Sequence, residues 1–105
     1  MSANEVTVVR VYLTEEKGHL DTMLKHLHDR GKVRGVTVFR GIAGFGKSGV
    51  MHTSSLVDVS LNLPVVVEFF EEPAKAEVLI DYLNTIVGPG HIVSWRAQLS
   101  TNNTH

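Results

Sequence analysis

The sequence predicts a single α+β domain with the element order β-α-β-β-α-β, the ferredoxin-like sandwich of a four-stranded antiparallel sheet with two helices on one face. Three observations lead to it. Four segments are rich in β-branched and aromatic residues, two segments have apolar residues at helical spacing, and glycine or proline stands at several junctions. A chain of 105 residues has the size of one small domain, so we assign residues 1–105 to it.

The first half of the pattern is a strand followed by a helix. Residues Glu5 to Leu13 are rich in valine, which is typical of a strand, and Thr14 to Gly18 form the turn after it. From Leu20 onward, leucine and methionine recur at i, i+3, i+4 and i+7. We therefore predict a helix from His19 to Arg30, which Gly31 ends.

Two strands and a second helix follow. Gly35 to Ile42 and Leu63 to Phe70 are the second and third strands, and the latter is apolar apart from Glu68. Pro73 suits the first turn of a helix, because its missing N–H is not needed there. The predicted buried stripe of this helix consists of Ala76, Leu79, Ile80, Leu83 and Val87.

The chain closes with a loop, a strand and a polar tail. Gly88-Pro-Gly90 stops the second helix, and Ile92 to Leu99 is the fourth strand. Residues 100–105, Ser-Thr-Asn-Asn-Thr-His, carry no apolar side chain that could anchor them, so we expect a flexible tail.

Both faces of the predicted sheet are apolar. In the first strand, alternate residues point to opposite faces, and the two sets are Val9, Val11 and Leu13 against Val6, Val8 and Tyr12. A sheet with water on one face should instead alternate apolar and polar residues. Two helices can cover one face only, so we expect other copies of the chain to cover the second.

The connection between the second and third strands, residues 43–62, is unusually long. Hairpin loops have about two to five residues, and a connection of about twenty is uncommon unless it is functional or disordered. This one is rich in glycine and small polar residues, with lysine and histidine among them. We expect it to be mobile without a ligand and to contact a partner.

Composition narrows the function. A net charge of −1 argues against general nucleic-acid binding, which needs a basic face. Cysteine is absent, which removes disulfides, thiolate zinc sites and cysteine nucleophiles, and suits the reducing cytosol. No apolar run approaches the ~20 residues of a membrane span, and the N-terminus does not look like a signal peptide. We expect a cytoplasmic protein without membrane insertion.

The segment Arg40 to Gly49, RGIAGFGKSG, matches two phosphate-binding patterns. G-x-x-x-x-G-K-[ST] falls on Gly41 to Ser48, and G-x-G-x-x-G on Gly44 to Gly49. Both patterns need a helix directly afterwards, and Ser48 to Ser55 has no helical periodicity. We therefore reject a P-loop NTPase and a Rossmann dehydrogenase. A glycine-rich, basic loop that binds an anion remains, against the alternative of a loop that merely needs glycine.

Two further residues near this loop are candidates for ligand contact. Arg40 closes the second strand, where it can pair with Glu68 or reach a ligand. His52 can titrate near neutral pH, bind a metal or make a hydrogen bond within the loop. The spacing of the remaining polar residues predicts no catalytic triad, carboxylate pair or metal site, so we expect a protein that is not an enzyme.

The order of these elements and motifs resembles the PII signalling proteins. Those proteins carry a glycine-aromatic-glycine-basic sequence at the root of their long T-loop, as in Gly44-Phe-Gly-Lys-Ser-Gly49, and a glycine-rich B-loop where this chain has Gly88-Pro-Gly-His-Ile92. More closely, the chain resembles the DUF190 family of PII-like proteins. The stretches that carry this likeness are Arg40 to Gly46, Met51-His-Thr53 and Leu63 to Glu68. The likeness covers about residues 5 to 99.

The resemblance implies a homotrimer whose sheets face a central axis, with an adenine nucleotide in each of three clefts between subunits. Its position-by-position counterparts here are Gly44, Phe45, Gly46 and Lys47 in the T-loop root, and Gly88, Gly90 and His91 in the B-loop. Nucleotide binding would change the segment 43–62, which would signal to a target protein. The expected protein is thus a PII-like regulator.

Departures from the PII pattern limit the expected class of ligand, and two alternative functions remain. Ser48 replaces a glutamine that helps to hold magnesium and 2-oxoglutarate, and His91 replaces a B-loop lysine. Fewer charges facing the phosphates favour AMP or a cyclic nucleotide over ADP or ATP. One rival is a small-ligand or metal-binding trimer like the CutA proteins, which share this architecture. A slow nucleotide hydrolase is the other.

Overall fold

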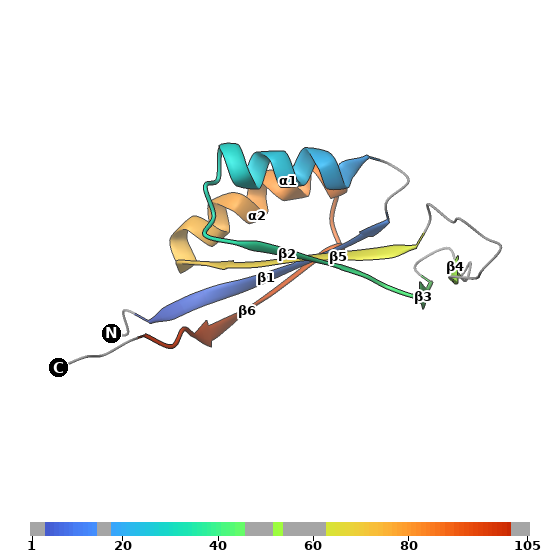
Figure 1. Ribbon diagram of the computed structural model, residues 1–105. Coiled ribbons are helices and arrows are strands. Elements are labelled where there is room, and N and C mark those ends of the chain that lie inside the picture. Colours follow the sequence, from blue (N-terminus) through green and yellow to red (C-terminus); the bar gives the residue numbers. More distant parts are fainter. Residues whose placement is uncertain (1–3, 15–17, 46–51, 54–62, 102–105) are drawn as a thin grey trace.

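A computed structural model of the chain describes residues 4–14, 18–45, 52–53 and 63–101, and it has the predicted α+β architecture. Its four-stranded antiparallel sheet has the order β2-β5-β1-β6, and both helices lie on one side of it (Figure 1). The strands of this sheet are β1 (Glu5–Thr14), β2 (Val36–Arg40), β5 (Pro64–Glu71) and β6 (Ile92–Gln98), and the helices are α1 (His19–Asp29) and α2 (Pro73–Val87). None of the helices in the described ranges is long and apolar enough to cross a membrane.

The long connection contains a short pair of strands that the sequence analysis did not predict. Strand β3 (Ala43–Gly44) pairs antiparallel with β4 (His52–Thr53), so that Ala43 lies opposite Thr53 and Gly44 opposite His52. A strand at 52–53 leaves no room for the helix that a P-loop would place after its lysine, which agrees with the rejection of that motif.

Strand boundaries differ from prediction by one or two residues. Strand β1 continues to Thr14, and β6 ends at Gln98 instead of Leu99. Strand β2 spans Val36–Arg40, not Gly35 to Ile42, because the chain leaves the sheet after Arg40 to enter β3. Apolar content does not mark these ends, since the residues beyond them are also apolar or neutral.

The core lies between the two helices and one face of the sheet. Alternate residues of β1 and β5 are fully or almost fully buried there, namely Val9, Val11, Leu13, Val65, Val67 and Phe69. Met23 and Leu27 of α1 and Ala76, Leu79 and Leu83 of α2 close over them. The predicted stripe residues Ile80 and Val87 lie at the margin of this cluster. Burial of these side chains, each worth roughly 1.5–3 kcal/mol, favours the two-layer arrangement.

The end of helix α1 is stabilised differently from the prediction. Gly31 follows the helix as expected, and its N–H donates to the carbonyl of His26. The left-handed residue, however, is Lys32 (φ 50°) rather than the glycine. Gly31 has another role: a Cβ there would lie 2.9 Å from Cδ2 of Leu79, so glycine lets α1 end close to α2 without displacing that side chain.

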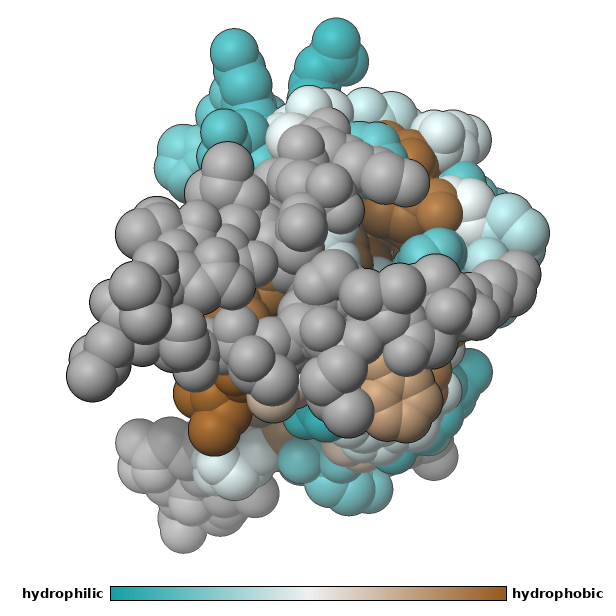
Figure 2. Space-filling model, turned by 90° about the vertical axis from the view of Figure 1, so that its right-hand side faces the viewer, coloured by the Kyte–Doolittle hydropathy of each residue, from teal (hydrophilic) through white to brown (hydrophobic). Residues whose placement is uncertain are grey.

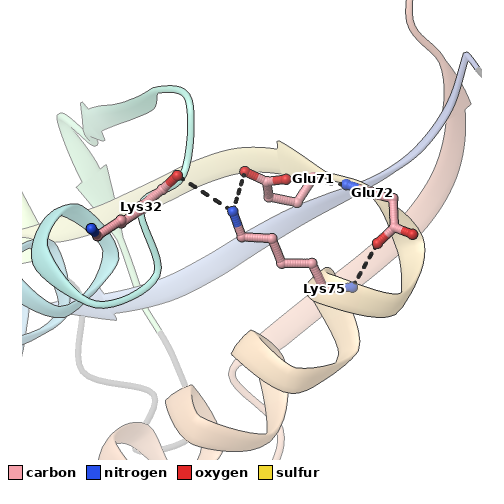
Figure 3. Close-up of polar contacts among 4 residues, drawn as sticks. All are labelled: Lys32, Glu71, Glu72 and Lys75. Atoms are coloured by element: carbon pink, nitrogen blue, oxygen red, sulfur yellow. Dashed lines mark hydrogen bonds and ion pairs between the residues drawn. The ribbon is translucent and has the colours of Figure 1, made fainter.

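A polar cluster fixes the loop after α1 to the start of α2 (Figure 3). The Lys75 ammonium lies 3.4 Å from Oε2 of Glu71 and donates to the carbonyl of Lys32. Glu72 caps α2 by accepting a hydrogen bond from the N–H of Lys75 at 3.0 Å. Glu71 is only 4% exposed, so Lys75 balances a buried carboxylate at the end of the sheet opposite β3 and β4.

The sheet face that the helices leave open is apolar, as predicted. Tyr12, Phe39, Phe70, Val93 and Trp95 lie on it and are each between 37% and 51% exposed. A glutamate does interrupt this face at Glu68, and its partner is Arg10 of β1.

Candidate ligand site

The root of the T-loop-like segment is held against the start of β5 by two glycines. The N–H of Gly41 donates to the carbonyl of Pro64 at 2.7 Å. A Cβ on Gly41 would lie 2.7 Å from Cγ of Pro64, and one on Gly44 would lie 3.0 Å from it. The proline ring therefore occupies the space that side chains at both positions would need. This explains the glycines at 41 and 44 by close approach within the chain, independently of any ligand.

The residues around this root are open to solvent. Arg40 is exposed at the end of β2, opposite Val65 of β5. Ile42 and Phe45, on either side of strand β3, are 80% and 68% exposed, so two apolar side chains face solvent there. Oε1 of Glu68 accepts hydrogen bonds from Nε and Nη2 of Arg10. Arg40 lies opposite Val65 and, by strand alternation, on the other face of the sheet from Glu68. Register explains this: Arg10, not Arg40, lies directly opposite Glu68.

The B-loop-like segment is a tight turn at the C-terminal end of α2. Gly88 and Gly90 have φ values of 78° and 90°, which side chains rarely adopt, so glycine is required at both positions. The N–H of Gly88 donates to the carbonyl of Asn84 and closes the helix. This helix end carries partial negative charge, so the turn does not attract a phosphate through the helix dipole. Any attraction of a phosphate to this turn must come from positive side chains or free N–H groups.

His91 follows this turn and is tied to β1. The Tyr12 N–H donates to the carbonyl of His91 at 2.8 Å, and Nδ1 of His91 lies 3.0 Å from the carbonyl oxygen of Tyr12. A carbonyl can only accept, so Nδ1 carries the proton in this arrangement. The exposed ring then presents Nε2 as an acceptor when His91 is neutral and as a donor when it is protonated.

The two glycine-rich segments lie at the same end of the sheet but at opposite edges. At that end, successive strands place these residues side by side across the sheet: Phe39, Val66, Tyr12 and His91. With strands about 4.8 Å apart, the T-loop root and the B-loop are separated by three intervals, or about 14 Å. Figure 2 views the molecule from the end that carries β3 and β4, and the helices lie in its upper half. One chain thus presents two half-sites rather than one closed pocket.

Of the nine predicted site residues, six are described with their side chains. Arg40, Gly44 and Phe45 belong to the first half-site, and Gly88, Gly90 and His91 belong to the second. The backbone of His52 pairs with Gly44. Gly46 and Lys47 lie outside the described residues. In the part of the chain that the structure describes, no group of three or more His, Cys, Asp or Glu side chains could hold a metal ion.

Sequence reasoning did not identify Pro64 and Tyr12 as parts of these half-sites. Pro64 reads as the first residue of a strand, and its contact with Gly41 and Gly44 depends on β2 pairing with β5. Tyr12 accepts a hydrogen bond from His91 through its backbone carbonyl. Every residue has such a carbonyl, so the residue type does not reveal this role. The strand order alone could have indicated both.

This fold and its two half-sites define a class of protein. The sheet with two helices, the long connection between β2 and β5 in the sequence and the glycine turn before β6 are those of the PII-like α+β fold. The family model DUF190, described as "Uncharacterized ACR", matches residues 6–99, and the chain belongs to that family. A UPF0166 protein of Aquifex aeolicus is 37% identical over 68 residues, which are 65% of this chain and 69% of the relative.

Solved structures with the same fold include PII-like and CutA proteins. CPII from Thiomonas intermedia K12, in a structure bound to ADP and bicarbonate, has a TM-score of 0.68 and 17% identity, and the match covers 90% of this chain and 88% of CPII. The divalent ion tolerance protein CutA1 from Ehrlichia chaffeensis has a TM-score of 0.61 and 9% identity, with 97% of this chain and 88% of CutA1 covered. At these identities the likeness establishes the fold.

Proposed function

We propose that this protein is a PII-like regulator, a homotrimer that binds an adenine nucleotide in clefts between subunits. The observation that carries the proposal is the placement of the two half-sites at opposite edges of one sheet end. A single small ligand reaches both only where the β2 edge of one subunit lies beside the β6 edge of its neighbour. The apolar open face supplies the surface through which three copies associate.

The proposed ligand is an adenine nucleotide with few phosphates, AMP or a cyclic nucleotide before ADP or ATP. The CPII structure with bound ADP supports this class of ligand. In the proposed cleft, backbone N–H groups of Gly44 to Lys47 and the Lys47 ammonium hold the phosphate from one subunit. From the neighbouring subunit, His91 and the turn from Gly88 to Gly90 approach the same phosphate. Arg40, Phe45 and His52 complete the T-loop side.

The proposed output is a change in residues 43–62, which form the surface for a target protein. The nucleotide orders this segment, and the target distinguishes the two states. Amide hydrogen exchange in 43–62 should therefore slow when the nucleotide is added. We propose that the protein acts by binding rather than catalysis, as the PII-like fold of its neighbours supports. It works in the cytoplasm, where adenine nucleotides are abundant, and needs no nucleic acid or membrane.

Calorimetry on two single variants, with sizing, tests the shared cleft. Lys47→Ala and His91→Ala should each weaken nucleotide binding about tenfold, since a charge-assisted hydrogen bond contributes roughly 1.5–3 kcal/mol. Lys25→Ala and His28→Ala alter exposed residues of α1 and serve as matched controls. Unchanged affinity in both cleft variants would place the ligand elsewhere.

Mixing the two cleft variants separates a shared site from a site within one chain. If Lys47 and His91 meet across a subunit boundary, randomly mixed trimers regain a tight site in about one cleft in four. If both residues serve one chain, no tight site returns. This readout does not depend on which adenine nucleotide binds best.

A small-ligand or metal-binding trimer is the second candidate, because a CutA1 protein shares the fold. Divalent metals without nucleotide should then raise the melting temperature, whereas nucleotides should not. A ligand at 100 times its Kd stabilises by about 2.7 kcal/mol, so a thermal-shift screen of both ligand classes separates the two functions.

A further inference from the structure

The open face of the sheet carries one charged pair at its centre. Arg10 lies on β1 and Glu68 on β5, the two middle strands, and they are direct cross-strand neighbours. Around them are the exposed apolar residues Tyr12, Phe39, Phe70, Val93 and Trp95. In the end-on view of Figure 2, hydrophobic side chains are visible in the lower half, among hydrophilic ones, as well as at the upper right.

The pair has good geometry, but one oxygen of Glu68 can still accept hydrogen bonds. Nε of Arg10 donates to Oε1 of Glu68 at 2.9 Å, Nη2 donates to the same oxygen, and the guanidinium lies 5.4 Å from the ring centroid of Trp95. The hydrogen bond with Glu68, and then that with Tyr12, raises the pKa of Arg10 above its usual value. Oε2 of Glu68 makes no hydrogen bond with the described residues, and the Glu68 side chain is 29% exposed.

A covering surface must satisfy this pair as well as the apolar residues around it. Covering the pair removes water from both charges, and an uncompensated carboxylate oxygen is then costly. The pair itself has no net charge, which does not favour a nucleic acid or an anionic membrane. A second copy of the same face brings apolar side chains together with its own arginine and glutamate, so it complements both.

We infer that Arg10 and Glu68 fix the register in which copies of this chain associate, with Oε2 of Glu68 accepting a hydrogen bond from Arg10 of the partner subunit. This rests on the proposed assembly. Valine and aromatic surfaces can slide over one another at little cost, whereas a misaligned register places a charge against Val93 or Trp95 of the partner subunit. The charged pair therefore excludes alternative alignments and sets the geometry of the clefts.

Single and double charge reversals test the inference. Arg10→Glu makes the central pair wholly acidic, and Glu68→Arg makes it wholly basic, so each variant alone should lose the assembly while remaining folded by circular dichroism. The double variant Arg10→Glu with Glu68→Arg exchanges the two charges and so restores an opposite charge at every boundary of a trimer. It should regain the wild-type mass in native mass spectrometry. Arg96→Glu is the matched control: Arg96 pairs with Glu5 at 3.1 Å, and strand alternation places both on the other side of the sheet.

The outcomes separate this inference from the proposed assembly. A monomeric wild-type chain would overturn both. An oligomeric wild type with unchanged single reversals, or a double reversal that stays monomeric, would overturn the register role alone. If a reversal prevents folding, the apolar double variant Arg10→Met with Glu68→Met decides. It should associate into several species of different mass, and a single species with the wild-type mass would contradict the inference.

Discussion

The ring of His91 is fixed to the backbone of Tyr12, with Nδ1 lying 3.0 Å from the carbonyl oxygen across 79 positions of sequence. This contact determines which nitrogen faces a ligand. Because Nδ1 donates to the carbonyl, Nε2 offers a lone pair when the ring is neutral and an N–H with positive charge when it is protonated. A phosphate is repelled by the first form and bound by the second.

A positive charge at position 91 should therefore tighten nucleotide binding. At one fixed pH, we expect His91→Lys to bind AMP several-fold more tightly than His91→Gln, because only the lysine offers a charge-assisted hydrogen bond to the phosphate. Calorimetry on the two variants measures the difference. Equal affinities would show that the side chain at position 91 does not face the phosphate.

Assembly should depend on the open sheet face and not on the helices. Light scattering of the wild type should give three times the 11.6 kDa of the chain. Val93→Lys places an ammonium on the open face and should yield monomers, because a buried lysine is costly without a partner. Val78→Lys is the matched control, since Val78 is 69% exposed on α2, compared with 51% for Val93 on β6. Equal masses for both variants would exclude the face as the interface.

The glycines of the T-loop root should be needed for folding as well as for binding. Gly41→Ala puts a Cβ 2.7 Å from the Pro64 ring, so we expect a loss of about 1–3 kcal/mol in the free energy of unfolding. Gly35→Ala meets no atom within 4 Å and should be neutral or slightly stabilising, by about 0.4–1 kcal/mol. Urea denaturation compares the two. A neutral Gly41→Ala would mean that the root rearranges freely.

The Lys75 ammonium should stabilise the fold through the buried Glu71 carboxylate. Lys75→Met leaves this carboxylate with only the N–H of Glu72, at 3.3 Å, and should cost about 1–3 kcal/mol of stability. The double variant with Glu71→Gln should recover part of the loss, because the buried charge is then absent. Thermal melts of the four proteins form a double-mutant cycle, and additive effects would contradict the coupling.

Local patterns were sufficient to predict the two helices and the four strands of the main sheet. The helical spacing around Met23 and Leu27, and the valine-rich strands, are set by residues only a few positions apart. The apolar character of both sides of β1 likewise indicated that a second surface must cover the sheet. The two-residue strands β3 and β4 were missed, since two positions carry too little pattern to specify a strand.

The half-sites were predicted in part. Gly88 and Gly90 could be assigned to a turn from the sequence, because their role is local. Gly41 and Gly44 looked like phosphate-binding glycines, whereas the structure shows their close contact with Pro64, which lies some twenty residues further on. The sequence did not show which arginine lies beside Glu68, because that depends on the register of β1 and β5, which sets Arg10 opposite Glu68.

The sequence by itself determined the order of the two helices and the four main strands and the apolar character of both sheet faces, because periodicity and composition act over short stretches of chain. Only the tertiary structure decided that Arg10 faces Glu68, that Pro64 fills the space beside Gly41, and that His91 contacts Tyr12. These contacts depend on strand order and register. Those properties follow from the packing of the whole core, which no local stretch of sequence encodes.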